Sequence, residues 1–293
     1  MNRYIALQKV IEVGSFTKAA EVLGYTQSSV SQMIASLEKE IGMKLLVRTR
    51  HEISLTPEGN TLFPYIEQAI YQYRSIYEKV NEIKKLDTGV IRIGTFSSIS
   101  YQWLPDLVKG FQEKYPNVEF VFYQGDYSSI EKWIHTGKVD FGFITPSAVK
   151  NIETEILEKG EMLVVLPKCH PLHKKEKIQI KEISEIPFIL LEEGHYNETM
   201  IAFEKENKKP NIKFIVHDDF TIMRMVEKEM GISILSELMT KESMYNIETK
   251  SLDPPIYRTV AVGYKNKSML PIAARRFIDY ISSQIKTNIE NDI

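Results

Sequence analysis

The chain has 293 residues, of which 43% are hydrophobic, so it is long enough for about two domains with buried cores. Its 37 Lys and Arg residues nearly balance 39 Asp and Glu residues, which leaves a formal net charge of −2. These values exclude a disordered or fibrous chain. They also show no general basic excess of the kind that by itself indicates nucleic-acid binding.

The single cysteine, Cys169, cannot form an intramolecular disulfide, which argues against a disulfide-stabilised secreted protein. The first residues carry charges at Lys9 and Glu12 and lack the apolar core of a signal peptide. No apolar run approaches the ~20 residues that a membrane span needs. We therefore expect a cytoplasmic protein that makes no membrane contact.

Residues 3–13 predict a first helix, and residues 15–40 predict two further helices joined by a tight turn. Ser15 is a typical helix N-cap, Gly24 ends the first of the two helices, and Thr26 caps the next one. This last helix has aliphatic residues at helical spacing on one face. Its other face carries uncharged hydrogen-bonding side chains, namely Gln27, Ser28, Ser31, Gln32 and Ser36.

This pattern is typical of a helix-turn-helix, whose second helix enters the DNA major groove. Amide and hydroxyl groups can pair there with the donors and acceptors on base edges. The alternative is a plain helical hairpin whose polar face is only solvated.

Residues 45–55 change to an alternating rhythm that predicts a small β-hairpin, or wing. Arg48 and Arg50 flank its tip, and guanidinium groups pair well with phosphate oxygens. The alternative is two ordinary surface arginines.

Thr56-Pro57-Glu58 predicts the start of a long helix, in which Pro64 should loosen the first turns. Its apolar residues are spaced by three and four, which makes a narrow seam. We expect this seam to pair with the same helix of a second subunit in a homodimer or homotetramer; packing onto its own domain is the alternative. The seam residues are Phe63, Ile66, Ile70, Tyr73, Ile76, Val80 and Ile83.

The stretch from residue 19 to residue 59 resembles the DNA-binding domain of LysR-type transcriptional regulators. The resemblance is carried by A-A-E-V-L-G-Y-T-Q-S-S-V-S-Q-M-I-A-S-L-E-K-E-I-G, then L-L-V-R, then L-T-P-E-G. Two positions depart from the family: Leu46 replaces the usual Phe, and His51 replaces an arginine that contacts the DNA backbone. The resemblance implies DNA contacts by Thr26, Gln27, Ser28, Ser31, Gln32, Arg48 and Arg50.

From Val90 onward, strand and helix patterns alternate. Strands are expected at 90–94, 118–123 and 139–145 with helices between them, which favours parallel pairing through right-handed crossovers. A second set spans 162–235, followed by a strand at 259–264 and a helix at 272–285. The order is consistent with two α/β lobes that the chain crosses twice.

The resemblance implies that these lobes form a periplasmic-binding-protein-like effector domain. The predicted architecture is therefore an α/β protein with a winged helix-turn-helix (1–58), a linker helix (59–87) and a two-lobed effector domain (88–293). Lobe I comprises about 88–160 and 267–293, and lobe II comprises about 161–266.

In open α/β sheets, ligands bind beyond the carboxyl ends of the strands. Three stretches of this chain fit that place, and they contain Thr95, Ser97, Ser98, Thr145, Gly194 and His195. Hydroxyls and free N–H groups at a helix start suit an anion, so we expect a small anionic metabolite between the lobes. The alternatives are simple helix capping for the serines and an exposed loop position for His195.

The densest cluster of reactive side chains is Cys169, His170 and His173, but no group of carboxylates accompanies it, and we expect no metal there. No nucleophile, zinc-protease or phosphate-loop motif occurs, so we expect neither catalysis nor a cofactor. The predicted function is an effector-controlled regulator that binds double-stranded DNA. The alternatives are a regulator whose lobed domain receives a protein partner, or a solute-binding protein, for which residues 1–87 would have no use.

Overall fold

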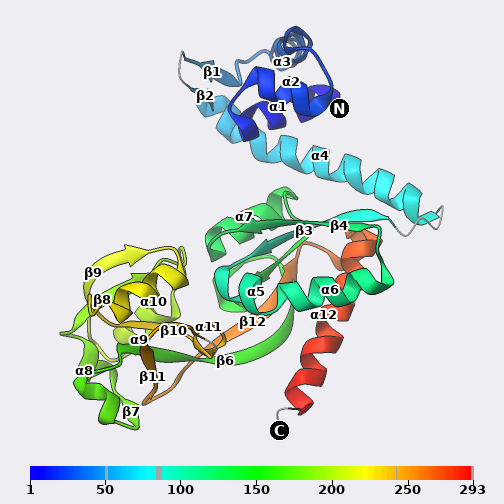
Figure 1. Ribbon diagram of the computed structural model, residues 1–293. Helices are drawn as coiled ribbons and strands as arrows, with labels where there is room; N and C mark the ends of the chain where they lie inside the picture. Colours follow the sequence, from blue (N-terminus) through cyan, green and yellow to red (C-terminus); the bar gives the residue numbers. More distant parts are fainter. Residues whose placement is uncertain (50–51, 84–87, 242, 292–293) are drawn as a thin grey trace. The chain divides into compact units, whose positions relative to one another are not determined.

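The computed structural model describes residues 1–49, 52–83, 88–241 and 243–291 (Figure 1). Its contacts divide the chain into an N-terminal unit, residues 1–86 with 135–138, and a C-terminal unit, residues 87–134 with 139–293. Within the described ranges, no helix is both long enough and apolar enough to cross a bilayer.

The N-terminal unit begins with three helices, α1 (Asn2–Val13), α2 (Phe16–Leu23) and α3 (Gln27–Ile41). Ser15 accepts a hydrogen bond from the amide of Lys18 at 3.3 Å, and Thr26 accepts one from the amide of Ser29 at 3.2 Å. Each side chain satisfies an amide that has no partner within its helix. The helices end at glycines with left-handed φ angles of 63°, 70° and 77°: Gly14, Gly24 and Gly42.

The wing follows α3 as two antiparallel strands, β1 (Leu46–Arg48) and β2 (Ile53–Leu55). The buried carboxylate of Glu38 on α3 holds the start of this wing. Its Oε1 accepts from the amides of Leu45 at 2.9 Å and Leu46 at 3.3 Å, and its Oε2 accepts from Nζ of Lys44 at 2.7 Å. Burial alone would raise the pKa of Glu38, but these donors outweigh burial and lower it.

The long helix α4 (Pro57–Ile83) begins directly after β2 and continues through Pro64. Its first turn lies so close to the segment entering β1 that a Cβ on Gly59 would be 2.3 Å from the carbonyl oxygen of Leu45. Only glycine fits this close approach without a shift of the backbone. Thr56 fixes the same corner, because its hydroxyl accepts from the amide of Gly59 at 2.9 Å and donates to the carbonyl of Lys44 at 2.7 Å.

The apolar seam of α4 divides into two parts. Ile66 and Ile70 are buried in the core that α1, α2 and α3 form, so the first half packs onto its own unit. Ile76 and Val80 further along are 61% and 37% exposed. The first half of the seam therefore follows the alternative in which α4 packs onto its own domain, and the exposed side chains of the second half leave an apolar face.

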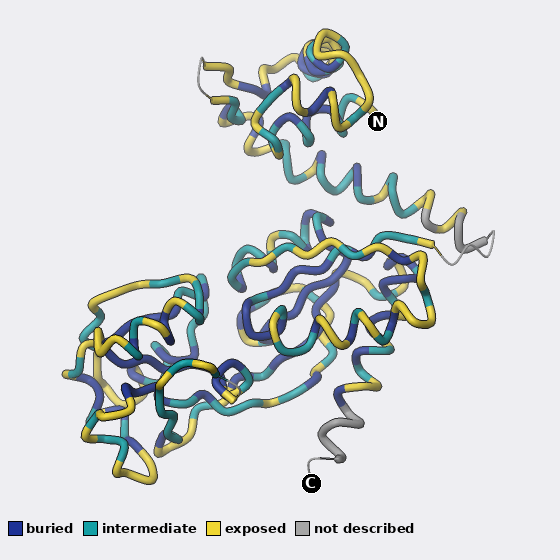
Figure 2. The backbone as a smooth tube through the Cα atoms, viewed as in Figure 1, coloured by how far each residue is buried: buried dark blue, intermediate teal, exposed yellow. Residues whose placement is uncertain are grey.

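The first lobe of the C-terminal unit is a sheet in the order β4-β3-β5-β12-β6, with parallel pairing among the first three strands and antiparallel pairing beyond. Figure 2 shows its central strands as buried. The strands are β3 (Gly89–Thr95), β4 (Val118–Gln124), β5 (Phe141–Ile144), β6 (Glu153–Pro167) and β12 (Ile256–Tyr264). The helices are α5 (Ser97–Gln102), α6 (Leu104–Lys114), α7 (Tyr127–Thr136) and α12 (Ile272–Asn291).

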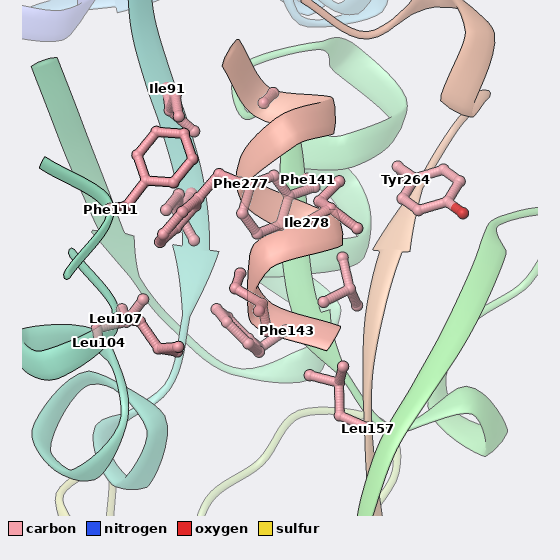
Figure 3. Packing of buried hydrophobic residues seen from close by; sticks show 14 of the residues in the cluster. Ile91, Leu104, Leu107, Phe111, Phe141, Phe143, Leu157, Tyr264, Phe277 and Ile278 are labelled. Atoms are coloured by element: carbon pink, nitrogen blue, oxygen red, sulfur yellow. The ribbon is translucent and has the colours of Figure 1, made fainter. Parts of the chain in front are cut away.

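Phe277 of α12 is central to the core of this lobe (Figure 3). Its ring contacts those of Phe111 and Phe120 at centroid distances of 4.9 and 5.0 Å. The last helix of the chain therefore covers the first strands of the effector domain, as the two predicted lobe crossings require.

The second lobe contains the remaining strands. The last part of β6 pairs antiparallel with β10 and β11, β7 pairs with β11, and β8 pairs with β9. These strands are β7 (Lys177–Ile178), β8 (Pro187–Leu191), β9 (Asn211–Val216), β10 (Ser233–Ser236) and β11 (Ile247–Leu252). The helices are α8 (Ile180–Ile183), α9 (Glu198–Lys205), α10 (Asp219–Glu227) and α11 (Glu237–Thr240).

The second crossing between the lobes comes earlier than the predicted boundary at residue 266. Val260, Val262 and Tyr264 of β12 are buried in the core of lobe I, and residues 261–263 pair with β5. The sequence marks 259–264 as a strand, but a strand pattern does not say which sheet the strand joins. The first crossing falls within β6, because Leu157 lies in the core of lobe I and Met162 lies in the core of lobe II.

Candidate functional sites

The outer face of α3 presents the residues that the sequence assigns to DNA. Gln27, Ser28 and Gln32 are exposed and Ser31 is half-buried, while the aliphatic row on the opposite face is buried. Thr26 is exposed too, but its hydroxyl caps the helix and lies 2.8 Å from the hydroxyl of Ser29. Four side chains on this face thus remain as candidates for base contacts.

Arg48, at the end of β1, joins this face. Its guanidinium lies over the ring of Phe16, 4.1 Å from the centroid, and its Nη1 donates to Oγ of Ser31 at 3.4 Å. The structure therefore brings the wing arginine and α3 together on one surface. The predicted contact residue Arg50 and its neighbour His51 lie outside the described residues.

A cavity of about 240 Å³ lies between the two lobes. Among the six predicted effector residues, only Ser97 lines it. Its hydroxyl accepts a hydrogen bond from Nε2 of Gln124 at 3.0 Å. The lining comes from both lobes: Phe96, Ser97, Gln124, Gly125, Asp126, Tyr127, Ser129, Leu191, Glu192, Glu193, His217, Asp219 and Arg258.

A buried guanidinium, that of Arg258 on β12, faces this cavity and is only 3% exposed. Its Nη2 donates to Oγ of Ser98 at 2.8 Å, and its Nη1 lies 3.8 Å from Oε1 of Glu193. The guanidinium also lies over the ring of Phe96, 4.9 Å from the centroid. Ser98 therefore acts through Arg258 and does not itself line the cavity.

Three buried carboxyls surround this cation. Glu193 and Asp219 line the cavity, and Glu198 lies directly behind them. Burial raises the pKa of Glu193 well above its ordinary value, the charge of Glu198 adds to the rise, and Arg258 opposes it. Burial also raises the pKa of Glu198 and of Asp219. One buried guanidinium thus lies near three carboxyl groups whose pKa values are raised.

Thr95 and Thr145 are buried beside the cavity but do not line it. The hydroxyl of Thr95 accepts from Oγ of Ser100 at 3.1 Å. The hydroxyl of Thr145 lies 3.1 Å from the phenol oxygen of Tyr127 and 3.2 Å from Oε1 of Glu198. Thr145 therefore orders the carboxyl group behind the cavity.

Gly194 and His195 connect the lobes instead of lining the cavity. Nδ1 of His195 lies 2.6 Å from Oγ of Ser128 on α7, and its Nε2 lies 2.7 Å from the carbonyl oxygen of Ala148. In the neutral tautomer that carries its proton on Nε2, both contacts are hydrogen bonds. Gly194 has φ +85°, and a Cβ there would be 2.3 Å from Oγ of Ser128, so the same approach requires glycine.

The sequence prediction missed the charged residues of the cavity, although two local signals exist. Arg258 is a lone cation in the apolar strand pattern I-Y-R-T-V-A-V, which is a mark of a buried charge. Asp218 and Asp219 are two adjacent acidic residues at the start of α10, where an acidic side chain can cap the helix. Only Asp218 caps, with its carboxylate accepting from the amide of Thr221 at 2.8 Å, and Asp219 faces the cavity.

The loop around Cys169 uses its histidines locally. Nδ1 of His170 accepts from the amide of Leu172 at 3.3 Å, and Nδ1 of His173 lies 2.7 Å from the carbonyl oxygen of His170. Over the described part of the chain, no three His, Cys, Asp or Glu side chains gather as a metal site would require.

Comparison with family models gives two matches that together cover most of the chain. Residues 1–60 match the bacterial regulatory helix-turn-helix protein model of the lysR family, and residues 84–286 match the LysR substrate binding domain. The uncharacterized HTH-type transcriptional regulator YvbU of Bacillus subtilis is 31% identical over 92% of this chain and 94% of its own.

Solved structures show the same fold. A full-length OxyR from Pseudomonas aeruginosa aligns over 97% of this chain and 93% of its own, with 22% identity and a TM-score of 0.71. Full-length CbnR in complex with its target DNA aligns over 96% and 98%, with 15% identity and a TM-score of 0.68. The effector binding domain of QuiR in complex with shikimate aligns over 68% and 98%, with 24% identity and a TM-score of 0.62.

The family consists of transcription regulators and not of enzymes. With a helix-turn-helix at its start and an effector-binding domain behind it, this chain belongs to the LysR family of transcriptional regulators.

Proposed function

We propose that this regulator reads its operator with the outer face of α3 and is controlled by a small molecule in the cavity between its lobes. The observation that carries the DNA part is the composition of that face. Gln27, Ser28 and Gln32 are exposed, uncharged and held on a helix whose opposite side is anchored in the core. Such groups suit the donor and acceptor patterns of base edges.

Arg48 supports the same assignment in a different role. Its position beside Ser31 places a fixed positive charge next to the proposed base-reading residues. When α3 enters the major groove, the phosphates of the DNA backbone run along the edge of that groove, within reach of such a charge. We propose that Arg48, together with Arg50, contacts the DNA backbone. Contacts of this kind add affinity for every sequence and do not select among them.

We propose that the protein acts in the cytoplasm as a homodimer or homotetramer joined through the second half of α4. The exposed apolar side chains of Ile76, Tyr77 and Val80 support this interface. Pairing of two such helices would carry two winged domains. Their recognition helices would then contact half-sites separated by about one turn of DNA, ~10 base pairs.

We propose domain limits of 1–58 for DNA binding, 59–87 for the linker and 88–293 for the effector domain, with the lobe crossings near residues 160 and 259. The effector is proposed to act by changing the arrangement of lobes or subunits, and so the spacing of the winged domains. The sequence alone indicates an anionic effector.

Two substitutions test the DNA assignment. Gln27→Ala is expected to relax base preference, whereas Arg48→Ala should weaken binding to all sequences alike and reduce the salt slope of log K by about 0.9. Selection of bound fragments from genomic DNA, followed by titration of one fragment at several salt concentrations, measures both effects. Arg48→Lys is the control, because it keeps the charge and therefore the slope. Equal losses on all fragments for both alanine variants would refute the assignment of α3 as the reading surface.

A further inference from the structure

Two short segments, one from each lobe, meet beside the cavity. The loop that follows β8 in lobe II reaches the first turn of α7 and the 3-10 turn Pro146–Ala148, which both belong to lobe I. The imidazole of His195 lies between them, with Nδ1 2.6 Å from Oγ of Ser128 and Nε2 2.7 Å from the carbonyl oxygen of Ala148. The backbone amide of His195 also donates to Oγ of Ser128, at 3.0 Å. One residue thus joins the lobes through three polar contacts.

These contacts are of a kind that can open and close. When the imidazole carries its proton on Nε2, it donates to the carbonyl of Ala148, and the hydroxyl of Ser128 donates to Nδ1 while it accepts from the amide. The side chain of His195 is 50% exposed, so the hydrogen bonds lie at the edge of the molecule and not in its core. Water can replace the partners of exposed groups, which keeps the cost of breaking such hydrogen bonds low.

The backbone at Gly194 is shaped for this contact. Its φ is +85°, and a Cβ there would be 2.3 Å from Oγ of Ser128. Only a residue without a side chain lets the two segments approach so closely. A larger residue at this position would push the lobes apart while leaving the side chains of Ser128 and His195 intact.

The same two segments form part of the cavity wall. Tyr127 and Ser129, on either side of Ser128, both line the cavity. Glu193, directly before Gly194, lines it from the other lobe. Tyr127 and Glu193 are buried, at 2% and 8% exposure, so this part of the cavity has little contact with solvent. A molecule that enters here must therefore separate the two segments.

We propose that Ser128, Gly194 and His195 form a latch that holds the two lobes closed over the cavity and opens to admit a small molecule. The regulatory meaning of the latch rests on the proposed role of the cavity as the effector site. The chain itself supplies all three polar contacts, so the closed arrangement needs no ligand. A ligand that contacts both lobes favours the same arrangement further, because it binds the closed form better than the open one.

The separation of the lobes can be measured by electron resonance between two spin labels. The labels are attached to Lys109→Cys on α6 of lobe I and Lys205→Cys on α9 of lobe II, both exposed positions, in full-length protein whose single cysteine is removed by Cys169→Ser. Dilution with an excess of unlabelled protein leaves only distances within one subunit. We expect one main distance, that of the closed lobes.

Three substitutions open the latch in different ways. Ser128→Ala and His195→Ala remove hydrogen-bonding groups, and Gly194→Ala inserts a wedge. Each should add a second, longer distance and raise the ratio of open to closed molecules by about tenfold, the effect of losing one or two hydrogen bonds. Combining Ser128→Ala with His195→Ala should change the ratio by less than the product of the two single changes, because the two residues share one contact.

Ser147→Ala is the matched control, because it removes an exposed hydroxyl of the same lobe beside Ala148, and it should keep the distance of the wild type. Circular dichroism confirms that each variant is folded. An unchanged single distance in all three latch variants would overturn the proposal. So would an equal open population in the control.

Access to the cavity is measured separately with a small thiol reagent. Ser97→Cys, again with Cys169→Ser, places one thiol on the buried lining of the cavity, and iodoacetamide should modify it slowly. Adding His195→Ala should raise the rate of modification by about tenfold, in proportion to the open population. Equal rates with and without His195 would show that small molecules enter by another route, and the gating role would be wrong. No effector takes part in either measurement, so a latch that opened as expected would stand even if the cavity were not the effector site.

Discussion

Glu38→Ala is expected to lower the free energy of unfolding of the N-terminal unit by about 3 kcal/mol, because it removes the acceptor of two buried amides. Leu45 and Leu46 each donate to this carboxylate at the point where β1 leaves the core, and both residues are buried. Hydrogen exchange of the amides in α3 and β1 measures the loss directly in the full-length protein.

The effect should depend on pH in a defined direction. The pKa of Glu38 is lower in the folded state than in the unfolded state, so its contribution is complete above the unfolded value, near about pH 4. It is lost as the pH falls through the lower folded value. The variant should therefore differ most from the wild type at neutral pH and least in acid.

Glu40→Ala is the matched control for this prediction. Glu40 lies two residues further along α3 and pairs with Arg3 at 2.5 Å, but its side chain is 56% exposed. Exposed ion pairs contribute between zero and about 1 kcal/mol, so this variant should be close to the wild type. If the two variants lost equal protection, the role of Glu38 in holding the wing would be wrong.

Arg258→Met is expected to destabilise the C-terminal unit by about 3–5 kcal/mol at mildly alkaline pH, because it leaves three buried carboxyls without their cation. Methionine fills most of the same space, so packing changes little. Thermal unfolding of the full-length protein, followed across a range of pH, measures this loss.

The pH dependence again follows from the direction of the shifts. The pKa values of Glu193, Glu198 and Asp219 are raised in the folded state, so the stability that they contribute is present below their unfolded values and lost as the pH rises through the folded ones. Without Arg258 these pKa values rise further. The stability lost by the Arg258→Met variant should therefore be small at about pH 5 and large at about pH 8. The double variant with Glu193→Gln should recover part of the stability at the higher pH. An equal loss at both pH values would point to packing instead of charge.

The parts of this molecule that local sequence determines were predictable. The helix-turn-helix follows from caps at Ser15 and Thr26, from glycine stops, and from apolar residues at helical spacing. Each of these signals lies within a few residues of the element that it defines. In the structure, α1 begins one residue before the predicted range of 3–13. Ser15, Gly24 and Thr26 lie at the helix ends that the sequence predicts for α2 and α3.

The cavity could not be predicted in the same way, because its groups meet only in the fold. Arg258 and Ser98 are separated by 160 positions in the chain. Hydroxyls such as that of Ser97, at the start of α5, were visible in the sequence and suggested an anion. The buried carboxyls come from the β8–α9 connection and from α10, and their convergence depends on the order of strands. The boundary between lobes failed for the same reason, since β12 pairs with β5 and β6 in one lobe after it starts in the other.

The pairing of β6 with β12 has a consequence for how the effector domain unfolds. Both strands run from one lobe into the other as a continuous ribbon, so the lobes share backbone hydrogen bonds and not merely a linker (Figure 1). Neither lobe can melt without breaking the ladder that supports the other. Calorimetry of the effector domain should therefore record one cooperative transition, and a bound effector should shift that whole transition and not one half of it.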